Sequence, residues 1–329
     1  MKNDGVFEVI LLLALPASGK SEVRNFLNNI EPEILKKEFH IGETLELDDF
    51  PYVHFMKLID QALEEEGQKR IFYPGEVPFI DSRDWGTLIN LLNEDYYDLL
   101  NRNVINCDSI AQYFFTRIDN AAKMVGIHPR LAKLDSDLRK RIAEKLNDEA
   151  QKILDFKYQQ YTEDLNGKTI VIEAARGGKD GSSYPLQDPF GYQYSLPQFC
   201  PEILSKAKIL YIWVTPEESR RKNEARTDPE NPGSNLFHGV PLTVMLNDYG
   251  CDDMLYLKEK SEKENTITIK TYGETYYLPI GIFDNRNDRT SFLRRDKEEW
   301  TKEEIKHVTE GIKQATDKMV AYKNNLNKE

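Results

Sequence analysis

The chain has 329 residues, of which 40% are hydrophobic and 30% charged. This composition is that of a soluble globular protein of one large or two modest domains, and it excludes collagen-like, fibrous and wholly disordered chains. The 56 Asp and Glu residues against 44 Lys and Arg give a formal net charge of −12, which argues against binding to long nucleic acid or to an anionic membrane.

The first apolar segments bear on the compartment as well as on the fold. Residues 9–17 form the longest apolar run, with nine residues against the roughly 20 that a membrane-spanning helix needs. The run could also be the core of a signal peptide, but two acidic residues lie before it. Three widely spaced cysteines, Cys107, Cys200 and Cys251, match no metal-binding spacing and are typical of a reducing compartment. We therefore expect a cytoplasmic protein with no membrane partner.

The amino-terminal half predicts strands followed by many helices. Residues 7–14 predict a strand buried on both faces, as in a parallel sheet, and 21–29 predict a helix. A second short strand is expected at 44–48. From 51 to 166 apolar residues recur three and four apart, which is typical of amphipathic helices. We expect these helices at 51–66, 85–100, 109–125 and 133–165.

Strand patterns return after this helical block. They lie at 168–173 and 207–214, and a hairpin is expected where 266–270 and 275–283 flank Tyr272-Gly273-Glu274. Pro279 would interrupt a ladder, so the last strand is expected at 280–283 only. A helix at 301–326 closes the chain. Strands that alternate with helices predict an α/β core at 1–50 and 167–329, with a helical insertion at 51–166.

Segment 14–21, ALPASGKS, joins the first predicted strand to the first helix. It matches the phosphate-binding pattern G-x-x-x-x-G-K-[ST] everywhere except at its first position, where Ala14 replaces Gly. In such a loop the backbone N–H groups and the helix N-terminus bind phosphate, the lysine reaches the outer phosphates and the hydroxyl binds Mg²⁺. The predicted nucleotide-binding residues are Pro16, Ala17, Ser18, Gly19, Lys20, Ser21 and Glu22.

This loop, followed by a strand that ends in Asp48-Asp49-Phe50, resembles the P-loop kinase family that includes polynucleotide kinases, zeta-type toxins and related small-molecule kinases. The resemblance covers residues 7–50, is weaker at 168–226 and 280–288, and leaves the insertion without a counterpart. It implies a three-layer P-loop NTPase fold with five parallel strands in the order 2-3-1-4-5. It also implies ATP and Mg²⁺ as cofactors.

The resemblance assigns roles to acidic residues at the strand ends. Asp48 would take the proton from the acceptor hydroxyl, and Asp49 would hold a metal-bound water. Helix capping explains an aspartate at this place equally well, so both interpretations stay open. Glu173 ends the strand at 168–173 and is the candidate carboxylate of a second metal-binding strand, and Arg176 could contact the acceptor. A capped strand and a flexible loop are the alternative.

Arginines and an asparagine complete the candidate site. Arg220, Arg221 and Arg226 follow a capping box and are similar to a lid segment whose arginines close on phosphates, although they could equally pair with their own glutamates on a solvated face. Asn285 follows the last strand, where the resemblance places the adenine base. A polar turn closed by Asx residues explains it almost as well.

The sequence thus predicts an ATP- and Mg²⁺-dependent phosphotransferase that acts on a hydroxyl acceptor. The expected catalytic residues are Lys20, Asp48, Arg220, Arg221 and Arg226, and the expected metal ligands are Ser21, Asp49 and Glu173. The insertion and the loop at 176–201 would select the acceptor. Two alternatives stay open: an NTPase switch that hydrolyses the nucleotide, and a nucleotide-binding scaffold without turnover. No motif identifies the acceptor or the oligomeric state.

Overall fold

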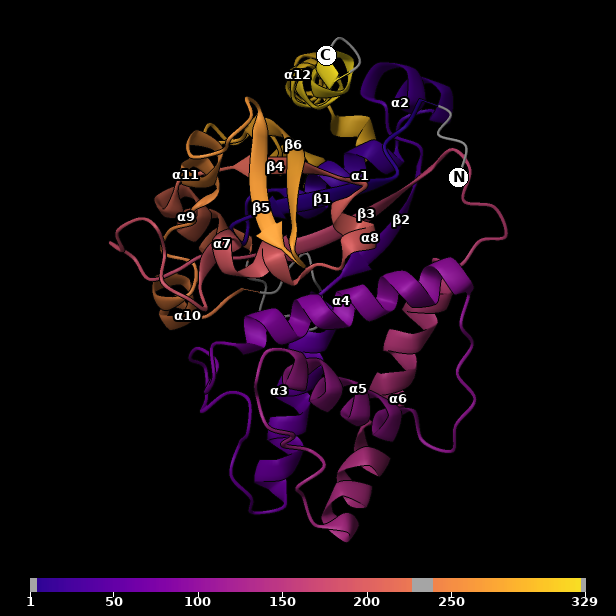
Figure 1. The fold of residues 1–329 in the computed structure, drawn as a ribbon, viewed down its shortest axis with the longest axis vertical. Helices are drawn as coiled ribbons and strands as arrows, with labels where there is room; N and C mark the ends of the chain where they lie inside the picture. The colour runs from indigo at the N-terminus through magenta and orange to yellow at the C-terminus, as the bar shows by residue number, and fades with distance from the viewer. Residues whose placement is uncertain (1–4, 227–238, 327–329) are drawn as a thin grey trace.

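The computed structural model describes residues 5–226 and 239–326 and shows an α/β fold (Figure 1). In this part of the chain a mostly parallel six-stranded sheet has the order β2-β3-β1-β4-β6-β5. The first five of these strands run parallel to one another, and β5 pairs antiparallel with β6. The strands are β1 Val9–Ala14, β2 Glu43–Asp48, β3 Lys168–Ala175, β4 Ala207–Trp213, β5 Thr266–Thr271 and β6 Glu274–Asp284.

The expected count of five strands is wrong, because the hairpin adds β5 to the edge of the sheet. The order of the parallel strands is nevertheless the expected one when β6 is taken as the fifth. The expected interruption at Pro279 is wrong as well. Residues up to Pro279 pair with β5 and residues from Ile280 pair with β4, so the missing proline N–H lies where one ladder ends and the other begins. Tyr272 and Gly273 have φ of 53° and 75°, as a two-residue hairpin turn requires.

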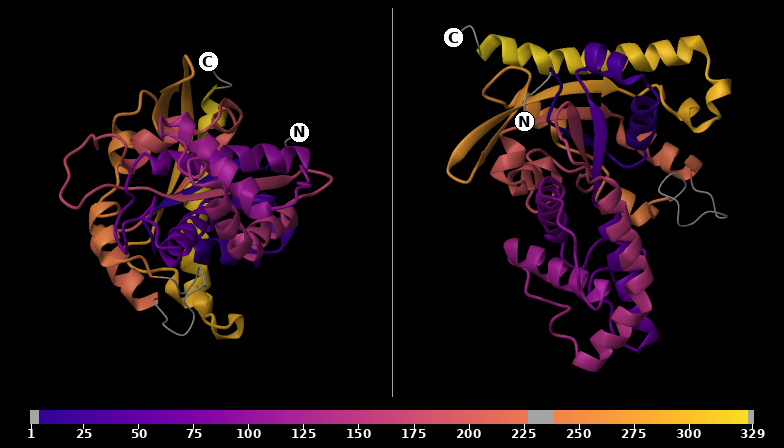
Figure 2. Two further views of the ribbon diagram at one scale, coloured as in Figure 1. Left: turned by 90° about the horizontal axis from the view of Figure 1, so that it is seen from below. Right: turned by 90° about the vertical axis from the view of Figure 1, so that its right-hand side faces the viewer.

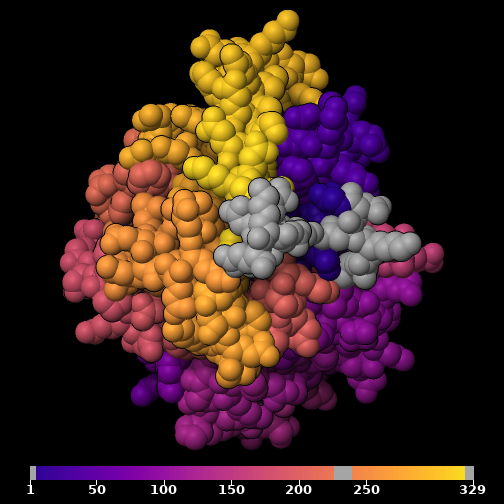
Figure 3. All heavy atoms as spheres, turned by 45° about the horizontal axis from the view of Figure 1, so that its top comes forward, coloured from indigo at the N-terminus to yellow at the C-terminus, as the bar shows by residue number. Residues whose placement is uncertain are grey.

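Helices cover both faces of the sheet. One face packs on α1 Lys20–Asn28, α2 Pro32–Phe39 and α12 Lys302–Leu326. The other face packs on α4 Asp84–Asn101, α7 Gly191–Ser195, α8 Pro201–Leu204 and α11 Met254–Glu259. Figure 3 shows the yellow α12 against the indigo amino-terminal segment, in agreement with contacts between α12 and α2. The sheet is thus the middle of three layers.

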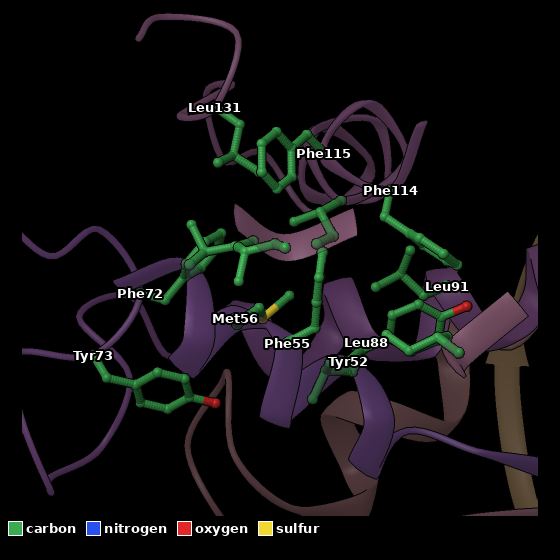
Figure 4. Close-up of a cluster of buried hydrophobic side chains, with 14 of the residues drawn as sticks. Tyr52, Phe55, Met56, Phe72, Tyr73, Leu88, Leu91, Phe114, Phe115 and Leu131 are labelled. Atoms are coloured by element: carbon green, nitrogen blue, oxygen red, sulfur yellow. The ribbon is translucent and has the colours of Figure 1, made fainter. Parts of the chain in front are cut away.

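A helical block extends beyond the carboxyl ends of β1, β2 and β3 (Figure 2). It consists of α3 Phe50–Glu65, α4, α5 Ile110–Met124 and α6 Ser136–Gln159. Its core is rich in aromatic side chains, with Phe55, Phe114 and Phe115 fully buried together (Figure 4). α4 also buries Leu92, Tyr96 and Leu99 against the sheet, so the block is not independent of the core.

Some helices begin later than predicted because a side chain caps their first turn. The helix expected at 133–165 is α6, which begins after Asp135 because that side chain accepts the backbone N–H groups of Asp137 and Leu138. The short α2, α7, α8, α10 Leu242–Asn247 and α11 were not predicted, whereas α9 Pro216–Arg226 was. None of the described helices combines the length and apolar character of a membrane span.

Candidate functional site

The segment between β1 and α1 forms a tight loop at the carboxyl end of the central strand. Ala17 and Gly19 have φ of 54° and 103°, and Gly19 is the N-cap of α1. Ala14, which replaces the first glycine of the pattern, is the last residue of β1 and does not have a positive φ. The methyl group is therefore accommodated without backbone strain. The backbone oxygen of Ala14 accepts a hydrogen bond of 3.0 Å from the Tyr192 hydroxyl.

Side chains from the carboxyl-terminal half of the chain hold this loop. Asn285 Nδ2 donates to the backbone oxygen of Ser18 at 2.6 Å and to Thr290 Oγ1 at 2.8 Å, and Ser219 Oγ donates to the Pro16 oxygen at 2.7 Å. Asn285 is fully buried, and its Oδ1 accepts the backbone N–H of Arg289. The expected contact of Asn285 with adenine is therefore wrong, because its amide is used within the protein. It positions the loop.

Two polar side chains of the loop face a cleft. Ser18 and Lys20 are 1% and 7% exposed, and both line it. Among the described residues, Ser18 Oγ has no hydrogen-bond partner. Lys20 Nζ lies 3.4 Å from the Leu15 carbonyl oxygen and 4.0 Å from a Glu173 carboxylate oxygen. A buried hydroxyl without a partner is costly unless a ligand completes it, so this cradle fits an anionic group.

The strand ends bring carboxylates to the same cleft. Asp48 and Glu173 are directly opposite each other in the parallel ladder of β2 and β3. Burial, followed by the charges of Glu173 and Asp49, raises the pKa of Asp48 to about 8, although Arg24 and the Phe50 N–H oppose the rise. Arg24 Nη1 lies 2.9 Å from Glu173 and 3.9 Å from Asp48. The folded protein therefore holds a proton on Asp48 more tightly than an exposed carboxyl would.

Asp49 is committed to an ion pair. Its Oδ2 lies 2.7 Å from Nη1 of Arg176, whose side chain is almost fully buried, and Arg176 also donates to the Trp85 carbonyl oxygen at 3.1 Å. The expected contact of Arg176 with the acceptor is wrong, since this side chain does not line the cleft. Asp49 does line the cleft, but the arginine already neutralises it, which weakens its expected role at a metal. Asp49 is the N-cap residue of α3, but its side chain makes no capping hydrogen bond, and the Phe50 N–H donates to the Asp48 carboxylate at 2.9 Å instead.

Two of the three arginines of α9, Arg220 and Arg221, form ion pairs outside the cleft. Arg221 pairs with Glu218 at 2.7 Å and with Asp288 at 3.3 Å, and Arg220 lies 3.5 Å from Glu217 and 3.9 Å from Asp180. Neither lines the cleft. The alternative of an ion-paired helical face therefore describes both, and their expected catalytic role is not supported. The side chain of Arg226 lies outside the described residues.

The cleft itself continues from the loop into the helical block and spans about 1110 Å³ of space, part of which is open solvent. Its first half is formed by residues 16–22, Asp48, Asp49 and Glu173. Its second half is formed by side chains of α3, the segment 73–77, α4 and residues 240–249. No residue of 176–201 lines it, so the expectation that this loop selects the acceptor is wrong for the described structure. The insertion does line it.

The residues present fit a magnesium ion that is shared with a bound phosphate. No group of three or more His, Cys, Asp or Glu side chains among the described residues has the geometry of a complete metal site. Mg²⁺ usually keeps several waters and takes one or two protein ligands beside substrate phosphates, so it needs no such group. Ser21 lines the cleft together with Asp48 and Glu173, and these are the candidate oxygen donors, although Arg24 already pairs with Glu173 at 2.9 Å. Glu22 is engaged with Arg294 at 2.6 Å.

Comparisons with models of protein families, with curated proteins and with solved structures find no match to this chain. Its functional interpretation therefore rests on the residues themselves. Sequence reasoning missed Arg24, which lies one helical turn after Lys20 and so shares its face of α1. It also did not single out Trp85 and Asp248, although both line the cleft. Only their long-range placement shows this.

Proposed function

We propose that the protein transfers the γ-phosphoryl group of ATP to a hydroxyl group of a small acceptor. The observation that carries the proposal is the convergence, in one cleft, of the loop with Ser18 and Lys20 and the carboxylates Asp48 and Glu173. Phosphoryl transfer depends on positioning and on charge stabilisation around the phosphates, beside a group that accepts the incoming hydroxyl proton. These residues supply both requirements.

Each residue has a separate role in this proposal. The N–H groups at residues 18–21 and the Ser18 hydroxyl bind phosphate oxygens, and Lys20 offsets the charge of the outer phosphates. A bound magnesium ion would neutralise charge on the β- and γ-phosphates, and Ser21 and Glu173 would hold it. Asp48 removes the proton of the acceptor hydroxyl. The acceptor oxygen then bonds to the γ-phosphorus, the bond from that phosphorus to the β-phosphate oxygen breaks, and ADP leaves.

The second half of the cleft favours this function over the alternative of an NTPase switch. A hydrolase needs room for one ordered water, whereas the cleft extends well beyond the carboxylates to Trp85 and Tyr249. A molecule larger than water fits this space.

The experiment follows label from [γ-³²P]ATP and Mg²⁺ into either inorganic phosphate or a small hydroxyl compound, across a panel of alcohols. We expect transfer to one acceptor class, and loss of that transfer by at least about 100-fold in Asp48→Asn, since removing a general base costs this much. The matched variant Glu76→Gln changes the same charge at the rim of the cleft and keeps transfer. Label in phosphate alone, whatever alcohol is present, would support the NTPase alternative instead.

A further inference from the structure

The half of the cleft beyond the carboxylates has an aromatic wall that is rigidly built. The rings of Tyr73 and Phe79 stack at 4.3 Å, Phe79 meets Trp85 edge-on at 4.9 Å, and Trp85 meets Tyr249 edge-on at 5.4 Å. Tyr73, Trp85 and Tyr249 of this series line the cleft. Offset and edge-to-face pairs of this kind fix ring orientations, so the wall is prepared for a flat apolar body.

Tyr73 is held in place from the backbone side. Asp60, which is fully buried in α3, accepts the N–H groups of Ile71, Phe72 and Tyr73, the last at 2.6 Å. Figure 4 shows Tyr73 at the edge of the aromatic cluster of the helical block, apart from Phe55 and Phe114. Tyr73 is therefore held in a fixed position, where it packs in the core of the helical block and also lines the cleft.

Two buried polar atoms of this half lack partners. The Tyr73 hydroxyl and Asp248 Oδ2 are both buried, and within the described residues neither makes a hydrogen bond. Asp248 as a whole is 2% exposed and lines the cleft. Burial alone raises its pKa to about 7. Buried polar atoms without partners are rare in native proteins, and in a cleft a bound ligand can supply the missing partner.

The charged side chains that line the cleft indicate which charge this ligand carries. Lys20 and Lys57 are the cationic side chains among its described lining residues. The carboxyl side chains among them are Glu22, Asp48, Asp49, Glu76, Glu173 and Asp248. Lys57 lies at the Tyr73 ring, 5.7 Å from its centre, while Lys20 belongs to the phosphate loop. Arginines outside the lining pair with Glu22, Asp49 and Glu173. The charged lining groups of the half beyond the carboxylates are therefore Lys57, the exposed Glu76 and the buried Asp248. An acceptor that placed its own phosphate or carboxylate against Asp248 would meet a like charge there.

We propose that the acceptor is a small, flat, uncharged or cationic molecule that carries a hydroxyl group and an N–H donor, and that Asp248 and Tyr73 bind this donor. This assignment rests on the proposed function, because the bound molecule is an acceptor only if the protein transfers phosphoryl groups. The ring lies on Trp85 and Tyr249, the N–H donor points to Asp248, and the hydroxyl faces Asp48 across the cleft. Asp248 is thus a specificity-determining residue, distinct from the proposed base.

The test uses four fragments that differ by one group each, with the full-length protein and no nucleotide. The complete probe is 4-(aminomethyl)benzyl alcohol. Benzyl alcohol lacks the amine, 4-(hydroxymethyl)benzoic acid replaces it with a carboxylate, and 4-aminobutanol lacks the ring. Dissociation constants are measured at pH 8 by ligand-observed NMR, because Asp248 is mostly ionised above its pKa of about 7.

We expect the amine probe to bind at least about tenfold more tightly than each of the other three, since each of them lacks either the charge-assisted hydrogen bond or the buried ring. Asp248→Asn should bring the amine probe to the level of benzyl alcohol, and Tyr73→Phe should weaken it severalfold. Glu76→Gln removes a carboxylate at the exposed rim of the same cleft and should leave the preference intact. Circular dichroism shows whether each variant is folded.

Three results would overturn the inference: equal or tighter binding of the carboxylate probe, binding of 4-aminobutanol as tight as that of the amine probe, or a preference that survives Asp248→Asn. Absence of detectable binding of the amine probe at millimolar concentration would overturn it as well. Because no nucleotide is present, these results are separate from the fate of the proposed function. Loss of that function would show as failure to bind ATP, with the fragment preference unchanged.

Discussion

Asp48 and Asp49 are neighbours in sequence, yet their replacement by asparagine should change stability in opposite directions. Asp48 is buried beside Glu173 and its pKa is raised to about 8 from an ordinary value of 3.8. In the unfolded chain this carboxyl ionises near pH 4, so the folded state binds more protons between pH 4 and pH 8. The free energy of unfolding contributed by Asp48 therefore falls as the pH rises through this window.

The size of the effect on the free energy of unfolding follows from the difference between the pKa of Asp48 in the folded and in the unfolded chain. Each pKa unit corresponds to about 1.4 kcal/mol, so the rise from 3.8 to about 8 would cost at most about 6 kcal/mol above pH 8. Local relaxation and water entry offset much of such a penalty, and we expect Asp48→Asn to gain about 1–3 kcal/mol at pH 9. Asparagine keeps the acceptor for the Phe50 N–H. The gain should vanish below pH 4, where both forms of the side chain are neutral.

Asp49→Asn is the matched control. It removes the partner of Arg176, whose guanidinium is almost fully buried, and should destabilise the protein by about 3–5 kcal/mol, since it leaves a buried charge without compensation. Urea unfolding of both variants and the wild type at pH 4, 7 and 9 measures these changes. Destabilisation by Asp48→Asn at pH 9, or a gain that does not depend on pH, would refute the reasoning.

Three further predictions concern the loop and α9. Asn285→Ala removes the amide that donates to the loop at the Ser18 oxygen and to Thr290 Oγ1, and it should weaken ATP binding about tenfold with a lowered melting temperature, whereas equal binding would exclude a positioning role. Gly19→Ala places a Cβ 2.4 Å from Thr290 Oγ1 at a positive φ, so titration calorimetry should show that this variant loses affinity for ATP. The control variant Thr290→Ser should keep the affinity of the wild type. Arg221→Ala breaks exposed ion pairs and should change stability by less than about 1 kcal/mol, with transfer retained; a large loss of transfer in the labelled-ATP assay would restore its catalytic role.

The parts that sequence predicted well are those with local causes. The apolar run at 9–14, the turn that follows and the helix after Lys20 are adjacent in the chain, so one motif specifies all three. The hairpin of β5 and β6 was predicted for the same reason. Pro279 was misjudged because its effect depends on which neighbour each half of β6 pairs with, and this is a property of the whole sheet.

The parts that failed depend on contacts between distant residues. Asn285 was assigned to a nucleotide base, but its buried amide reaches Ser18, 267 positions earlier. Arg176 was assigned to the acceptor, but it pairs with Asp49, 127 positions away. A polar residue in a pattern shows that chemistry is available without showing which partner takes it up. Apolar spacing in α4 likewise predicts a buried helix and leaves open that it packs on both the block and the sheet.

Binding of ATP is the measurement that tests the central claim most directly. Isothermal titration of the wild-type protein with ATP and Mg²⁺ should give one site of micromolar affinity, and Lys20→Ala should lower that affinity by at least about tenfold because it removes a charge-assisted contact. Lys57→Ala removes a cation from the other half of the same cleft and should bind ATP as the wild type does. Failure of the wild type to bind ATP, or equal binding by Lys20→Ala, would contradict the account.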